Sequence, residues 1–183
     1  EAYVSNASSP VTDLFALEAV ARIARYLVRA IQQPEDIEAR SEMMLASLEA
    51  GLAFSNAILG AVHAMAHSLG GFLDLPHGEC NAILLPHVVR FNYEAKAERY
   101  EDLGRAMGIE MSGSAMEDRR ETLAHGLASL CRTAGVTRGL RELGVVPEVL
   151  PALADKAVLD PCMLTNPRDA SPQDIVAIYE HAL

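Results

Sequence analysis

Cysteine is scarce in this sequence, and its pattern excludes two kinds of protein. The three cysteines, Cys80, Cys131 and Cys162, are odd in number and lie far apart along the chain. Such spacing does not fit a disulfide framework, and it lacks the paired C-x-x-C pattern of a cysteine zinc site. We therefore expect a protein of a reducing compartment, and we predict the cytoplasm.

A basic cluster and a long apolar run are also lacking. The formal net charge is −10, so the overall field of the protein repels nucleic acid and anionic lipid. Charged or polar residues interrupt every apolar stretch before it reaches a membrane-spanning length. We predict neither a nucleic-acid partner nor a membrane partner.

The first residues lack the marks of a natural start. The opening EAYVS has no methionine, no basic n-region and no apolar h-region. We interpret this N-terminus as a cut, and we expect any targeting segment to lie upstream of it.

Helical periodicity dominates the rest of the sequence, and no segment alternates as a strand does. From Thr12, the expected N-cap, apolar residues recur at helical spacing until Pro34, after which a second helix follows. After Gly51, the nearly uncharged stretch LAFSNAILGAVHAMAHSL predicts a helix buried on most of its surface. We expect Gly70-Gly71 to end that helix and Pro86 to kink the next one, in ECNAILLPHVVRFN.

Further helices are expected in the second half of the chain, each bounded by glycine, proline or asparagine. Their predicted ranges are about 95–108, 117–134, 138–143, 148–158 and 172–182. The predicted fold class is all-α, a single helical bundle over residues 1–183 with the two uncharged helices at its centre.

Four of the six histidines gather in the least charged part of the chain, between positions 63 and 87. His63 and His67 are four residues apart, so their rings share one face of a helix. A chain that folds back at Gly70-Gly71 brings His77 opposite His63, and two such imidazoles can share one divalent ion. The alternative is that each is a core or loop histidine bonded to a backbone carbonyl. The remaining histidines, which we take as structural or surface residues, are His87, His125 and His181.

Two familiar catalytic or binding motifs are absent. The HAMAH segment has Ala64 where an H-E-x-x-H protease needs a glutamate as its general base. The sequence has no strand followed by G-x-G-x-x-G or a related glycine run. It therefore offers no phosphate-binding loop for a dinucleotide.

A longer motif carries a family resemblance. The segment GAVHAMAHSLGGFLDLPHGECNAILLPHVVRFN, residues 60–92, is similar to the signature of iron-containing, or group III, alcohol dehydrogenases. The similarity extends to EAYVSNASSPVTDLFALEA at the start, to EARSEMMLASLEAGLAFSNA, and to DPCMLTNPRDAS at residues 160–171. This resemblance implies the helical C-terminal domain of a dehydroquinate synthase-like fold.

The resemblance also implies a metal site. In that family one aspartate and three histidines hold a divalent ion, usually Fe2+ and sometimes Zn2+. His63 and His77 match two of those histidines, and the aspartate and the third histidine are expected just upstream of Glu1. The resemblance places His67 beside the metal and the nicotinamide, as the expected catalytic and cofactor-contacting residue, where it relays a proton or holds the alcohol.

The implied parent enzyme interconverts small alcohols and aldehydes or ketones with NAD(H) or NADP(H). Its N-terminal α/β nucleotide-binding domain is expected upstream, so we predict that this chain alone is inactive. A homo-oligomer is compatible with this interpretation. Two alternatives stay open, a maleylacetate reductase, which shares the LGG and LPH patterns, and a helical module without catalysis. The segment GECNA at residues 78–82 is more similar to the alcohol dehydrogenases.

The segment from Asp160 to Arg168 resembles the family loop that borders the substrate cleft, although a plain turn between two helices explains it equally well. Cys162, within that segment, is either a thiol facing the cleft or a small apolar filler.

Overall fold

The computed structural model describes residues 1–113 and 115–183, and in these residues it contains helices and loops but no strand. This confirms the predicted all-α class. The α-helices are α1 (Pro10–Gln32), α2 (Ile37–Ala57), α3 (Ala61–Leu73), α4 (His77–Asn92), α5 (Ala97–Ala106), α6 (Met116–Thr133), α7 (Leu150–Ala157) and α8 (Pro172–Ala182). Short 3-10 helices lie at η1 (Tyr93–Lys96), η2 (Arg141–Leu143), η3 (Pro147–Val149) and η4 (Pro161–Thr165).

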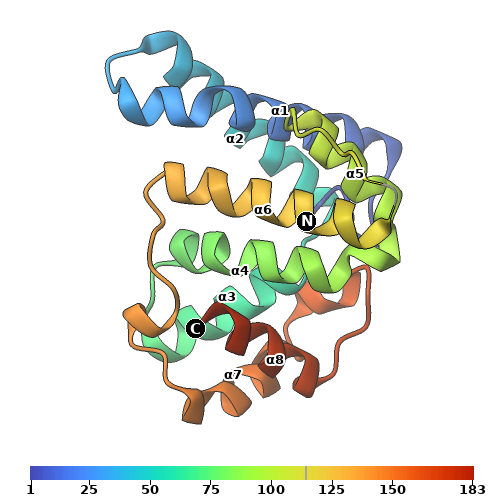
Figure 1. The fold of residues 1–183 in the computed structure, drawn as a ribbon, viewed down its shortest axis with the longest axis vertical. Coiled ribbons are helices and arrows are strands. Elements are labelled where there is room, and N and C mark those ends of the chain that lie inside the picture. Colours follow the sequence, from blue (N-terminus) through green and yellow to red (C-terminus); the bar gives the residue numbers. More distant parts are fainter. Residues whose placement is uncertain (114) are drawn as a thin grey trace.

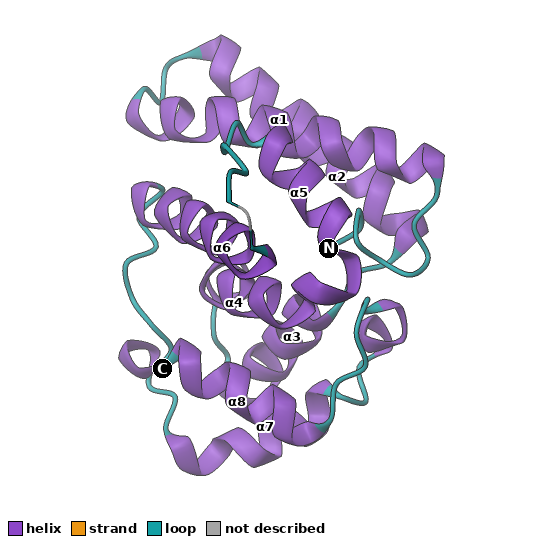
Figure 2. Cartoon of the chain, turned by 45° about the vertical axis from the view of Figure 1, so that its right-hand side comes forward, coloured by secondary structure: helices purple, strands orange, loops and turns teal. Residues whose placement is uncertain are grey.

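Helices α3 and α4 form a middle layer of the fold, with other helices packed on both sides of it (Figure 1). On one side of this layer α6 packs on α4, and the hairpin of α1 and α2 lies beyond it. On the other side α7 and α8 pack on α3 and α4 (Figure 2). The two least charged helices therefore lie at the centre, as their composition predicts.

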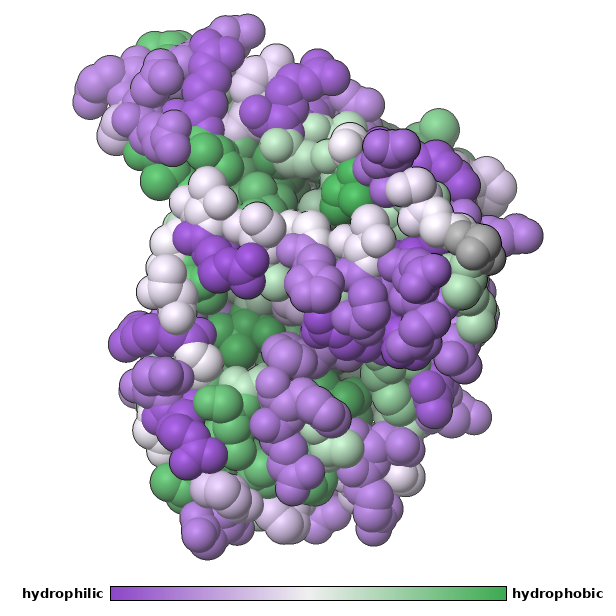
Figure 3. Space-filling model, viewed as in Figure 1, coloured by the Kyte–Doolittle hydropathy of each residue, from purple (hydrophilic) through white to green (hydrophobic). Residues whose placement is uncertain are grey.

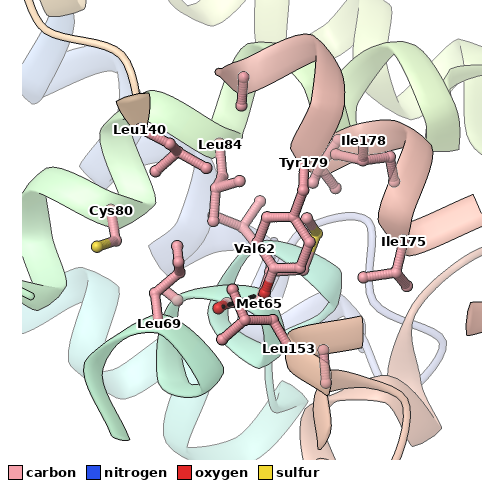
Figure 4. Packing of buried hydrophobic residues seen from close by; sticks show 14 of the residues in the cluster. Val62, Met65, Leu69, Cys80, Leu84, Leu140, Leu153, Ile175, Ile178 and Tyr179 are labelled. Atoms are coloured by element: carbon pink, nitrogen blue, oxygen red, sulfur yellow. Dashed lines mark hydrogen bonds between the residues drawn. The ribbon is translucent and has the colours of Figure 1, made fainter. Parts of the chain in front are cut away.

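The core between α3, α4 and α8 fixes the middle layer. Leu69 of α3 and Leu84 of α4 are completely buried (Figure 4). The hydroxyl of Tyr179, on α8, donates to the Met65 carbonyl oxygen of α3 at 2.8 Å, which satisfies the one polar atom of a buried ring (Figure 4). His63 and His67 of α3 lie outside this core and are not buried.

The start of α1 differs from the prediction at Thr12. Ser9 is the N-cap, and Thr12 lies three residues after it. The two residues form a capping box, in which the side chain of each accepts the backbone N–H of the other. Pro10 occupies the first helical position, where its fixed φ suits the helix and its missing N–H costs nothing. The helix therefore begins after Ser9, and the prediction of Thr12 as N-cap is wrong.

The uncharged stretch after Gly51 is not one helix. It breaks between Ala57 and Ala61, where Ile58 adopts a φ of 59°, and the axes of α2 and α3 differ by 99°. A residue far away in the sequence stabilises the break, because the Ser5 hydroxyl donates to the Ala57 carbonyl oxygen. No single helix among the described residues is long and apolar enough to cross a membrane, and only α2 and α3 taken together, across this bend, pass that test by length and composition.

Gly70 and Gly71 do not end α3, contrary to the prediction. Both lie inside the helix, which continues to Leu73, and neither has a positive φ. The turn is made instead by Asp74, which adopts the left-handed conformation with φ 55° and donates its N–H to the Gly70 carbonyl oxygen at 3.0 Å. Aspartate is one of the few residues with a side chain that tolerate this conformation. The chain then enters α4 at His77 after only three residues.

The predicted helices over 117–134 and 172–182 are confirmed by α6 and α8. The helix predicted over 138–143 is wrong, since only the 3-10 turn η2 forms there. The reason is a long-range bond, because the N–H of Leu140 donates to the Ala182 carbonyl oxygen at the end of α8 instead of joining a local helix.

Candidate metal centre

The rings of His63, His67 and His77 converge at one place on the surface of the middle layer. The ring centroids of His63 and His77 are 5.4 Å apart, those of His67 and His77 are 5.4 Å apart, and those of His63 and His67 are 6.1 Å apart. His63 and His67 stand one turn apart on α3, and His77 begins α4. The fold thus brings together all three histidines that the sequence analysis singled out, across the short turn at Asp74.

A buried carboxylate orients His63. Glu1 hydrogen-bonds the Nδ1 atom of His63, and its other oxygen accepts the N–H of Val62 at 2.7 Å, at the start of α3. Burial by itself raises the pKa of the Glu1 carboxyl, but the hydrogen bond with His63 and the backbone bond from Val62 help to hold it below its usual value. With Nδ1–H donated to this carboxylate, the lone pair of His63 stands on Nε2, which is the form that binds a metal.

The Nε2 atoms of His63 and His77 face a common point near Asn81. The Asn81 amide nitrogen lies 3.4 Å from Nε2 of His63 and 3.0 Å from Nε2 of His77. The Oδ1 atom of Asn81 is buried and has no hydrogen-bond partner among the described residues. Two aimed imidazole nitrogens beside an unsatisfied polar atom form a site that an ion or a water molecule can complete.

The environment of His77 favours the neutral imidazole. Burial, followed by the charges of His63 and His67, lowers the pKa of His77 below its usual value. A histidine must be neutral to donate its lone pair to a metal. Burial and the two neighbouring histidines therefore favour the neutral form of His77, the form that is able to bind a metal.

His67 has a carboxylate partner of its own. Its Nδ1 atom lies 2.9 Å from Oδ2 of Asp160, and its side chain is 44% exposed. Asp160 is the N-cap of η4, and its Oδ1 atom accepts the N–H of Cys162 at 2.8 Å. Burial raises the pKa of Asp160, but the bonds from Cys162 and His67 outweigh burial and hold it below its usual value. Asp160 is therefore an ionised group that fixes the orientation of the His67 ring.

The loop from Asp160 to Arg168 is more than a plain turn, since its residues reach the site. The buried side chain of Asn166 accepts the N–H of Ala61, the first residue of α3, at 3.0 Å. It also forms a reciprocal pair of amide hydrogen bonds with Asn92 of α4, each 2.9 Å long. Asn166 thus caps the helix that carries His63 and ties it to the helix that carries His77.

Three supporting residues were missed in the sequence analysis, namely Glu1, Asn81 and Asp160. Asn81 had a local signal, because it follows His77 by four residues and so shares its helix face. Asp160 precedes a proline, which marks a turn start but not a histidine partner. Glu1 meets His63 across 62 positions, and no local pattern indicates that contact.

The other three histidines lie outside this group. The Nδ1 atoms of His125 and His181 each bond to the carbonyl oxygen four residues earlier in their own helix, at 3.0 Å and 2.7 Å. His87 lines a separate cavity with His181 and Arg90, and burial, with the Arg90 charge, lowers its pKa to about 4. These contacts agree with the structural role expected for all three.

Comparison with known proteins decides the family. The model of the C-terminal part of the Fe-containing alcohol dehydrogenase family matches residues 1–183. This chain belongs to the iron-containing alcohol dehydrogenase family. It is 43% identical over 182 residues to 1,3-propanediol dehydrogenase of Citrobacter freundii and 45% identical over 182 residues to alcohol dehydrogenase 4 of Saccharomyces cerevisiae.

Each of these matches covers 100% of the chain and 47% of the relative, so the chain spans about half the length of the curated relatives it matches. Among solved structures, the alcohol dehydrogenase from Oenococcus oeni matches with a TM-score of 0.96 and 37% identity, over 100% of this chain and 48% of that one. The maleylacetate reductase from a Rhizobium species is less similar, with a TM-score of 0.84 and 26% identity, over 100% of this chain and 48% of that one.

An apolar groove borders the site in this member of the iron-containing alcohol dehydrogenases. Its volume is about 420 Å³, and it runs between α1, α4 and α6, with His63 and Asn81 at its edge. Figure 3 shows hydrophobic residues in the hollow between α6 and the hairpin of α1 and α2. The apolar residues contributed by α1 and α6 are Val20, Ile23, Ala24, Leu27, Leu127 and Leu130.

Proposed function

We propose that this chain is the metal-binding half of an NAD(P)-dependent alcohol dehydrogenase that interconverts small alcohols and aldehydes or ketones. The observation that carries the proposal is the convergence of the Nε2 atoms of His63 and His77 on the Asn81 amide. We assign these two atoms as ligands of one divalent ion, Fe2+ first and Zn2+ second. Membership of the iron-containing family supports the choice of metal.

The residues present fit such an ion. Imidazole nitrogens suit both iron and zinc, and a histidine ligand is usually oriented by a carboxylate or carbonyl at its second nitrogen. Glu1 provides that carboxylate for His63. The unpartnered Oδ1 of Asn81 marks the same place as polar and incompletely satisfied. Two nitrogens leave the coordination shell incomplete, so we assign the remaining ligands to residues outside this chain.

The chemistry proposed for His67 is proton transfer. A bound divalent ion supplies Lewis acidity toward the alcohol or carbonyl oxygen. His67 is exposed beside the two proposed ligands, and Asp160 fixes its ring through Nδ1. Its Nε2 atom is therefore the one available to accept the alcohol proton and to pass it to solvent, as a general base does. We propose that the same atom also faces the nicotinamide.

The nicotinamide dinucleotide requires a second part of the protein. The described residues contain no strand, and the sequence has no glycine-rich phosphate loop. The relatives are about twice as long as the matched segment, which supports an upstream α/β domain that binds NAD(H) or NADP(H). The apolar groove beside His63 supports the same proposal, because a hollow lined by so many apolar residues calls for a covering segment.

Hydride transfer from alcohols to NAD+ or NADP+ by the full-length protein tests the proposed function. We expect metal-dependent reduction of NAD+ or NADP+ with short primary alcohols and diols, measured by the ultraviolet absorbance of the reduced ring. The His63→Ala and His77→Ala variants lose turnover, whereas His125→Ala, which changes a histidine bonded to its own helix, retains it. The 183-residue chain alone shows no turnover, because it lacks the residues that position the dinucleotide.

Two results would contradict the proposal. A full-length protein without turnover on any alcohol or aldehyde would favour a helical module without catalysis. Turnover confined to maleylacetate would favour a maleylacetate reductase, the relative with lower identity.

A further inference from the structure

A second cluster of metal-binding side chains lies on the Nδ1 side of His67. One potential ligand atom from each of His67, Asp160 and Cys162 lies within 4.8 Å of the other two. We propose that these three side chains form a separate binding site for a divalent ion of the zinc type, distinct from the pair of His63 and His77. The site combines one nitrogen, one oxygen and one sulfur ligand.

The spacing of the nitrogen and oxygen ligand atoms is close to that around a tetrahedral ion. Zinc bonds of about 2.0–2.3 Å place tetrahedral ligand atoms roughly 3.3–3.6 Å apart. The Nδ1 atom of His67 and Oδ2 of Asp160 are 2.9 Å apart, so the two need to separate by only a fraction of an ångström. The His67 side chain is 44% exposed, which leaves the fourth position open to water.

The fold itself holds the three residues together. Asp160 and Cys162 flank Pro161, the first residue of η4, and the bond from the Cys162 N–H to Asp160 fixes that turn. His67 reaches the turn from α3, across 93 positions in the sequence. Two packed elements therefore supply the ligands, which is the usual basis of a preorganised metal site.

The sulfur ligand selects the type of ion. Thiolate and imidazole together favour zinc or cobalt over magnesium or calcium, which prefer oxygen alone. In the metal-free chain, burial and the hydrogen bond with Asp160 raise the pKa of the Cys162 thiol to about 12. Binding forms bonds from the ion to Sγ, Nδ1 and a carboxylate oxygen. The thiol proton leaves to solvent, and the imidazole carries its own proton on Nε2. No oxidant or reductant takes part.

Occupancy of this site has a consequence for catalysis that rests on the proposed function. An ion on Nδ1 of His67 and on Asp160 breaks the pair that orients the His67 ring. We expect zinc to inhibit the full-length enzyme through these residues while leaving the ion at His63 and His77 in place. Binding of the ion to this chain does not depend on that consequence.

Titration of the metal-free chain with Co2+ tests the site, because a thiolate ligand gives cobalt a charge-transfer absorption in the near ultraviolet. We expect that band in the 183-residue chain and expect Zn2+ to abolish it by displacement. Cys162→Ala and Cys162→Ser lose the band. Cys131→Ala retains it as the matched control, since Cys131 is a partly buried cysteine of α6. Thermal unfolding followed by circular dichroism shows that each variant is folded.

Further variants separate this site from the proposed catalytic one. His67→Ala and Asp160→Asn weaken Co2+ binding at the thiolate site by about 10-fold or more. His63→Ala leaves the thiolate band unchanged while removing the binding that belongs to the other pair. A chain without any thiolate band, or a band that survives in folded Cys162→Ala, would overturn the proposal whatever the outcome for the dehydrogenase activity.

Discussion

Replacement of Asn166 by alanine should cost the fold about 3 kcal/mol. The Asn166 carboxamide oxygen caps α3 through the N–H of Ala61, and loss of such a cap costs about 1 kcal/mol. The amide of Asn92 is 1% exposed and loses both of its bonds to Asn166, and leaving such a buried amide short of partners adds about 2 kcal/mol. For a chain of this size, 1 kcal/mol shifts the unfolding midpoint by about 2–4 °C, so we expect a decrease of about 6–12 °C.

Thermal unfolding followed by far-ultraviolet circular dichroism measures this decrease. Asn56→Ala is the matched control, because the exposed Asn56 makes a single side-chain bond, to the Leu52 carbonyl oxygen within its own helix. That variant should stay within about 0.5 kcal/mol of the original chain. If the midpoint of Asn166→Ala lies within about 2 °C of the control, the loop from Asp160 to Arg168 does not stabilise the start of α3. Our account of what holds His63 in place is then wrong.

Three other substitutions test separate parts of the structure. Gly71→Ala should stabilise the chain by about 0.5–1 kcal/mol, since Gly71 lies inside α3 with open space around its Cβ position, and a loss of stability would contradict that placement. Gly60→Ala should cost about 1–3 kcal/mol, because its Cβ would lie 2.8 Å from Oδ1 of Asn166 and 3.0 Å from Oε1 of Glu1, and an unchanged unfolding midpoint would contradict it. Burial lowers the pKa of His87 from 6.5 to about 4 in the folded chain. As the pH drops, the unfolded chain is protonated at this histidine before the folded chain is, so the free energy of unfolding should fall between pH 6.5 and about pH 4. Urea unfolding across that range should show a flatter pH dependence in His87→Gln, and an equal dependence in both chains would contradict the assignment.

Much of the fold follows from local spacing. The ends of α6 and α8 follow from helical periodicity between turn residues, and the central place of α3 follows from its lack of charge. The break between α2 and α3 does not follow from the sequence in the same way. It depends on Ser5, 52 positions before the Ala57 carbonyl oxygen to which it donates.

The candidate site is likewise predictable only in part from the sequence. The approach of His63 and His77 is predictable, because a reversal of the chain between them places their rings on facing segments. The position of the reversal was mistaken, since it lies at Asp74 and not at Gly70-Gly71. The carboxylate partners were not predictable, because Glu1 and Asp160 meet their histidines only through tertiary packing.

The most direct test of the central claim is nuclear magnetic resonance of the histidine ring nitrogens during Zn2+ titration of the 183-residue chain. Our account predicts that the Nε2 signals of His63 and His77 shift together, while Nδ1 of His63 keeps the proton that it shares with Glu1. His67 should respond separately and through Nδ1. Shifts confined to His87, His125 and His181, with His63 and His77 unchanged, would contradict the assignment of the metal centre.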